Sequence, residues 1–66
     1  MMKHAVLTIN KAGQVIYESP HQTAESAYDE YKKNIGIIKR FVKKCEEYTV
    51  VRTNEGQIMT METIRG

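Results

Sequence analysis

The fold of this chain is decided by residues 19–46, SPHQTAESAYDEYKKNIGIIKRFVKKCE, in the middle of its 66 residues. Apolar side chains recur there at alternating steps of four and three residues. This spacing places them along one side of an α-helix. The positions are Ala24, Tyr28, Tyr31, Ile35, Ile38, Val42 and Cys45. The sequence therefore predicts one long amphipathic helix over residues 19–46.

The beginning of this stretch has the pattern of a helix start. Ser19 can accept a hydrogen bond from the first turn, and Pro20 suits the first helical position because it has no N–H to satisfy. Gln22 completes a Ser-x-x-Gln capping box. We therefore expect the helix to begin at Ser19.

Gly36, near the middle of the stretch, leaves two alternatives open. A helix over residues 19–46 would be roughly 40 Å long, whereas strands of six or seven residues span only about 20 Å. Either the helix breaks between Asn34 and Gly36 into two shorter pieces, or it stays long and its overhang packs on another chain. The apolar spacing continues through Gly36, which favours one continuous or gently kinked helix.

A first β-hairpin is predicted over residues 3–18. The sequence alternates from Lys3 to Ile9 and resumes an extended pattern after Gly13, which can close a type I turn in the left-handed conformation. Pairing Asn10 with Gln14 sets Ile9 against Val15 and Leu7 against Tyr17. The predicted core face of this hairpin consists of Ala5, Leu7, Ile9, Val15 and Tyr17.

A second hairpin is predicted over residues 47–64, with its turn at residues 54–56. Pairing Thr53 with Gln57 gives two faces that are both partly apolar, so the sequence leaves open which of them is buried. One face carries Thr49, Val51, Met59 and Met61, and the other carries Tyr48, Val50, Arg52, Ile58, Thr60 and Glu62. The expected architecture is a single α+β domain over residues 1–66, of order β-β-α-β-β, in which one long helix packs on a sheet of two antiparallel hairpins.

The composition limits the class of protein. Hydrophobic residues make up 41% and charged residues 27% of the chain, as in a folded domain rather than a disordered tail. No apolar run approaches the roughly 20 residues that span a bilayer, and the opening residues lead into a strand rather than a secretory signal. A single cysteine cannot form an internal disulfide. We expect a cytoplasmic protein that does not bind membranes.

No arrangement of residues indicates catalysis. Cys45 lies on the predicted apolar side near the helix C-terminus, where the helix dipole disfavours a thiolate, so we expect a buried structural cysteine. His4 and His21 lack the spacing of metal ligands. There is no glycine-rich phosphate loop and no carboxylate pair placed as acid and base. We therefore expect no catalytic residue, no metal, no cofactor and no enzymatic activity.

The leading functional hypothesis is a small protein-interaction module. A helix longer than its sheet, with an unusually broad apolar side, leaves apolar surface for a partner. We expect a homodimer that also binds an unidentified protein. The candidate interface residues are Tyr31, Ile35, Ile37, Ile38, Phe41 and Val42.

Basic residues supply a second hypothesis of a different class. Six of them fall in the second half of the predicted helix, away from its apolar side: Lys32, Lys33, Lys39, Arg40, Lys43 and Lys44. They are explained most simply as a solvated helix face, and the net charge of +2 is small. The alternative is a surface that contacts nucleic-acid phosphates, with little sequence specificity and a steep dependence on salt.

Overall fold

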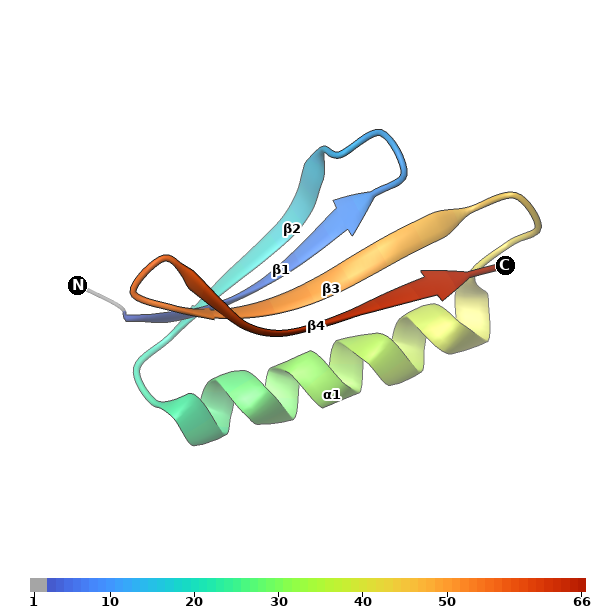
Figure 1. Ribbon diagram of the computed structural model, residues 1–66. Coiled ribbons are helices and arrows are strands. Elements are labelled where there is room, and N and C mark those ends of the chain that lie inside the picture. Colours follow the sequence, from blue (N-terminus) through green and yellow to red (C-terminus); the bar gives the residue numbers. More distant parts are fainter. Residues whose placement is uncertain (1–2) are drawn as a thin grey trace.

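The computed structural model describes residues 3–66 of the chain. Its elements are β1 (His4–Asn10), β2 (Val15–His21), α1 (Ala24–Phe41), β3 (Glu47–Asn54) and β4 (Gln57–Arg65). The strands form one antiparallel sheet of order β2-β1-β3-β4, with α1 packed on one face (Figure 1). The predicted α+β architecture of order β-β-α-β-β is confirmed.

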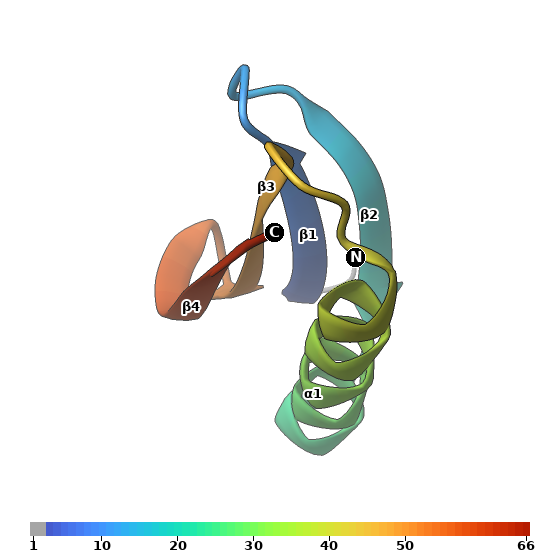
Figure 2. The same cartoon turned by 90° about the vertical axis from the view of Figure 1, so that its right-hand side faces the viewer.

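The two hairpins join through their first strands, so β1 and β3 lie at the centre and β2 and β4 at the edges. Figure 2 shows the strands arching over α1, which packs mainly against the central strands β3 and β1. Among residues 3–66, no helix or strand covers the opposite face. We call that uncovered side the open face.

The core lies between α1 and the centre of the sheet. Val6 and Val50 are completely buried, and they meet the buried helix residues Ala27, Tyr31 and Ile35. Ile64 of β4 completes the cluster, and the partly buried Ile38 and Val42 pack against it. The predicted apolar side of the helix is therefore the side that contacts the sheet, from Tyr31 to Val42.

The helix begins at Ala24, and the expected start at Ser19 is wrong. β2 extends to His21 because Ser19 and Pro20 pair with Val6 and Ala5 of β1. Proline is tolerated there because β2 is an edge strand. Every second backbone N–H of an edge strand points away from the sheet and needs no partner strand, so a residue without an N–H fits at such a position. The actual N-cap is Thr23, whose hydroxyl accepts a hydrogen bond of 3.1 Å from the Ser26 backbone N–H.

The helix is also shorter at its other end than expected. It runs without a break through Gly36, so the continuous alternative is confirmed, but it ends at Phe41 with Val42 as the C-cap. Its 18 residues span about 27 Å, close to the length of the strands, so the expected overhang is absent. Cys45 lies in the turn after the helix with φ of 71°, and it is exposed rather than buried.

The first hairpin has the predicted turn but not the predicted core face. Gly13 has φ of 86°, and its N–H donates to the Asn10 carbonyl at 3.0 Å. Ile9 pairs with Val15 as predicted, but a bulge at this point sets Tyr17 against Thr8 rather than Leu7. Val6 and Thr8, which lie two residues apart and so share one face of β1, are buried beneath the helix. Ala5, Leu7 and Ile9 therefore lie on the open face.

The second hairpin closes through a shorter turn than expected. Glu55 and Gly56 have φ of 52° and 82°, the pair of positive values typical of a two-residue type I′ turn. Asn54 therefore pairs with Gln57, and the expected pairing of Thr53 with Gln57 is wrong. Val50 packs in the core under the helix, so the face with Thr49, Val51 and Met61 is the open one, although neighbouring side chains leave Val51 only 2% exposed.

Candidate interaction site

The six predicted interface residues divide between the core and the surface. Tyr31 and Ile35 are buried in the core, and Ile38 and Val42 pack against it, so the fold itself uses them. Ile37 and Phe41 are 45% and 69% exposed. Only these two present much of their side chain to a partner.

Ile37 and Phe41 line a groove between α1 and β2. The β1–β2 hairpin diverges from the helix toward its turn (Figure 1), which leaves Ile16 half exposed. Two adjoining hollows of about 470 and 240 Å³ share Thr8, Ile16, Ile37 and Ile38. We call this surface the α1–β2 groove, and its floor is the buried Thr8.

Tyr48 lies at the end of the groove nearest the helix C-terminus. Its hydroxyl donates to Glu46 Oε2 at 3.3 Å. Partial burial, and then the neighbouring carboxylate, raise the pKa of the Tyr48 phenol above its ordinary value. The hydroxyl is therefore un-ionised at neutral pH and can donate a hydrogen bond.

Lys33 lines the groove on the helix side, and Arg40 lies beside Phe41 without lining either hollow. They are seven residues apart with Ile37 between them, which places their Cα atoms about 10 Å apart along the axis. Within residues 3–66 neither has a carboxylate within ion-pair distance. The Arg40 guanidinium lies 6.0 Å from the centre of the Phe41 ring. Neither cation therefore has an ion-pair partner in the described part of the chain. The hollows also contain two carboxylates: Glu30 accepts from Tyr17 and Ser19, and Glu46 accepts from Tyr48 and the Lys43 N–H.

The other predicted nucleic-acid contacts have different surroundings. Lys39 forms an ion pair of 3.1 Å with Glu62 of β4, and the Lys32 amine lies 5.3 Å from the centre of the Tyr28 ring. Lys43 and Lys44 follow the end of the helix and lie in the turn. Contact of all six basic residues with nucleic acid stays a prediction.

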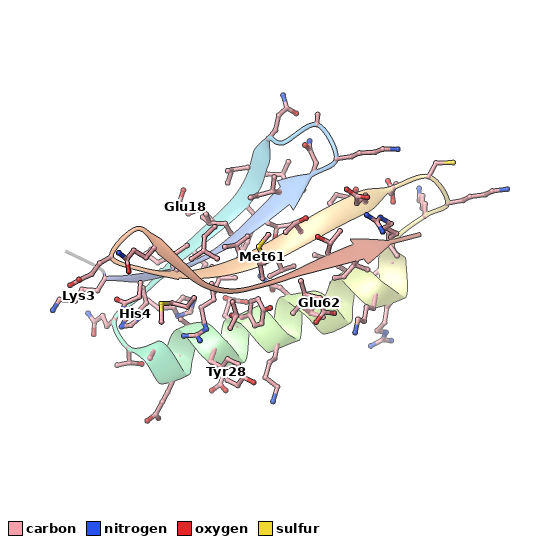
Figure 3. All side chains as sticks on the ribbon, viewed as in Figure 1. Lys3, His4, Glu18, Tyr28, Met61 and Glu62 are labelled. Atoms are coloured by element: carbon pink, nitrogen blue, oxygen red, sulfur yellow. The ribbon has the colours of Figure 1, made fainter. Side chains whose placement is uncertain are left out.

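The open face is the second apolar surface. The strand register shows which side chains lie in rows across this face: it pairs Leu7 with Val51, and Val51 with Met61. Figure 3 shows Met61 and Glu62 of β4 on opposite sides of the sheet, with Glu62 toward the helix. Met61 is 56% exposed. The rows contain Ala5, Leu7 and Ile9 from β1, Thr49, Val51 and Thr53 from β3, and Met61 and Thr63 from β4.

Charged pairs lie at both ends of the open face. Arg65 Nε donates to Glu47 Oε1 at 2.6 Å, and this hydrogen bond raises the pKa of the guanidinium. At the other end, the Lys3 amine lies 3.8 Å from Glu55. A hollow of about 660 Å³ at that end is lined by Ala5, Leu7, Glu18 and Thr53 among others. The open face thus has an apolar centre and a charged rim.

A polar cluster, which the sequence analysis missed, ties β2 to the first turns of α1. His21 Nδ1 lies 2.6 Å from Ser26 Oγ, and His21 Nε2 lies 3.1 Å from Ser19 Oγ. The Ser19 and Tyr17 hydroxyls both donate to Glu30. The cluster was missed because His21 was assigned to a helix. An edge strand that continues through proline was the signal that could have revealed it.

Within the described part of the chain, no group of three or more His, Cys, Asp or Glu side chains is placed to hold a metal ion. No helix among residues 3–66 combines the length and apolar character required to cross a bilayer. Comparison with models of protein families, with curated proteins and with solved structures found no match for this chain. Function is therefore inferred from the two apolar surfaces, the α1–β2 groove and the open face.

Proposed function

We propose that this chain is a small non-catalytic interaction module that forms a homodimer through the open face and binds another protein. The observation that carries the proposal is the apolar centre of a sheet face that no helix covers. A one-layer antiparallel sheet ordinarily presents polar side chains on its uncovered side. Here that side carries Leu7, Ile9 and Met61 around Val51; Met61 is 56% exposed, whereas neighbouring side chains leave Val51 only 2% exposed. An apolar patch of this kind on a small domain favours a partner.

The dimensions of the open face suit a second copy of this chain. Four strands of seven to nine residues, at about 3.3 Å per residue and about 4.8 Å between strands, cover roughly 23 by 19 Å, or about 440 Å² in plan. The solvent-accessible area of a surface covered with side chains is larger than its projected area. Specific interfaces bury about 800 Å² per partner and weak ones fewer than about 600 Å². We therefore expect a reversible dimer with a dissociation constant in the micromolar range.

The pattern of charge supports face-to-face packing. The apolar centre lies between the Glu47–Arg65 pair and the Lys3–Glu55 pair. Interfaces have this anatomy, because the centre excludes water while charges at the rim stay hydrated. Packed sheets lie about 10 Å apart, so the two helices would lie on the outside of the dimer. This arrangement replaces the expected contact between helix overhangs, for which α1 is too short.

We also propose that the protein is cytoplasmic. The free Cys45 thiol suits the cytoplasm, where thiols stay reduced.

Nucleic-acid binding through the basic residues is the alternative function, and salt-titrated binding to generic DNA and RNA tests it. Lys39 already forms an ion pair with Glu62, so we expect weak binding at moderate salt.

Sedimentation equilibrium between about 1 and 100 µM, a range that brackets micromolar affinity, tests the dimer. The average mass should rise with concentration toward twice that of one chain. Met61→Glu should keep the chain monomeric throughout, because it places a charge within the apolar rows of the open face. Since Met61 is 56% exposed, this change leaves the core intact, as circular dichroism should show.

Ile37→Glu is the matched control, because Ile37 is similarly exposed but lies on the helix side. It should dimerise as the unaltered chain does. A chain that stays monomeric at about 100 µM, or a Met61→Glu variant that still dimerises, would contradict the proposal.

A further inference from the structure

β2 has a free edge beside the α1–β2 groove. It is the outermost strand of the sheet, so within residues 3–66 no strand pairs with its outer backbone groups. Such an edge can pair with an extended peptide through main-chain hydrogen bonds. Pro20 has no N–H, which confines that pairing to residues 15–19. The two hollows beside α1 contain side chains of β2 and none of β4, so they adjoin the β2 edge of the sheet.

The groove can hold an apolar side chain from such a peptide. The bulge near Ile9 brings both Ile16 and Tyr17 of β2 to the groove. Across it lie the exposed Ile37 and Phe41 of α1, around a hollow of about 240 Å³. A branched apolar side chain inserted there would cover apolar surface that is exposed in the free chain.

The cations beside the groove favour acidic residues in the peptide, because the groove carboxylates Glu30 and Glu46 already accept hydrogen bonds within the chain. Lys33 and Arg40 lie on either side of Ile37, about 10 Å apart along the helix. In an extended peptide, side chains on one face at positions i and i+4 are about 13 Å apart, with position i+2 between them. Two acidic residues that flank an apolar residue in this spacing would reach both cations. Neither cation has another ion-pair partner within residues 3–66.

We propose that the edge of β2 and the α1–β2 groove bind an extended peptide segment of the pattern acidic-x-apolar-x-acidic. The peptide adds a fifth strand to the sheet, inserts its apolar side chain between Ile16, Ile37 and Phe41, and places its carboxylates near Lys33 and Arg40. This inference rests on the proposed interaction function and names the class of partner. It uses a surface separate from the open face, so the groove and the dimer can be tested independently.

The test is an NMR titration of the ¹⁵N-labelled chain with the end-blocked peptide Thr-Glu-Thr-Val-Thr-Glu-Thr. This peptide reads the same in both directions, so it fits either strand orientation. We expect saturable amide shifts in residues 15–19 and in residues 33–41. A peptide with lysine in place of glutamate should bind at least about tenfold more weakly. Methylating the backbone nitrogens should abolish binding, because it removes the donors that pair with β2.

Variants of the chain complete the test. Lys33→Glu with Arg40→Glu should weaken binding at least about tenfold, whereas Lys32→Glu, on the side of α1 near Tyr28, should leave it unchanged. Monomeric Met61→Glu should still bind the peptide. Shifts confined to the open face, equal binding of the lysine peptide, or no saturable shifts would overturn the inference and leave the dimer proposal standing. If Ile37→Glu prevents dimerisation, the groove holds a second copy instead, and both proposals fail.

Discussion

Ile35 and Ile37 lie two residues apart in α1 and have opposite surroundings. Ile35 is 9% exposed and packs in the core, while Ile37 is 45% exposed at the groove. Both were predicted as interface residues, because the apolar side of the helix looked broad enough to serve a partner throughout. The sheet covers only the part that points directly at it. At this scale, sequence periodicity identified the packed line of residues but could not divide it between the core and a partner.

The first prediction compares these two isoleucines. Ile35→Ala should lower the free energy of unfolding by about 2–4 kcal/mol, because it removes buried methyl groups and leaves a cavity. Ile37→Ala should cost less than about 1 kcal/mol, because its side chain is largely solvated. Urea denaturation followed by circular dichroism measures both. Equal losses would contradict the division between core and groove.

The second prediction concerns the Tyr48 phenol, whose pKa is raised by partial burial and by Glu46. Its ring should titrate at higher pH than the ordinary tyrosine value of about 10, as NMR of labelled tyrosine can show. Glu46→Gln should lower that pKa. A tyrosine whose pKa is higher in the folded than in the unfolded chain stabilises the fold fully at a pH below the unfolded-state pKa. This stabilisation is lost as the pH rises through the folded-state pKa. An unchanged pKa in Glu46→Gln would contradict the assigned hydrogen bond.

At the scale of elements, sequence reasoning identified each strand and the helix but misplaced their ends. Local signals at Ser19 and Gln22 favoured a capping box, yet pairing of Ser19 with Val6 holds that segment in the sheet. A cap is worth about 1 kcal/mol, so a row of strand contacts outweighs it. The predicted core face of β1 was wrong, because both faces of this strand carry apolar residues. The choice between them depends on Val50, which is distant in sequence.

The third prediction concerns Gly36, which lies within the helix with no heavy atom within 4 Å of an added Cβ. Gly36→Ala should therefore raise the free energy of unfolding by about 0.5–1 kcal/mol, through better helix propensity. Gly56→Ala is the contrasting change, because Gly56 has φ of 82° and alanine there is strained. Thermal unfolding should show one increase and one decrease. A loss of stability in Gly36→Ala would mean that the helix is kinked at this point.

At the scale of the whole molecule, one helix covers one face of a four-stranded sheet. The sequence predicts surplus apolar surface at the ends of an over-long helix. The surplus lies instead on the open face and in the α1–β2 groove. The location of this surplus apolar surface could not be predicted from sequence, because the end of β2 and the start of α1 depend on each other. The five residues 19–23 that were assigned to the helix belong to β2 and the loop before α1.

Isotope-filtered nuclear Overhauser measurements on a mixture of labelled and unlabelled chains test the dimer most directly. In a face-to-face dimer, the methyl groups of Leu7 and Met61 should show contacts between chains, because packed sheets lie about 10 Å apart and their side chains interdigitate. The methyl groups of Ile35 should show contacts only within one chain. Contacts between chains at Ile37 and Phe41, with none at Met61, would contradict the proposal that the open face is the dimer interface.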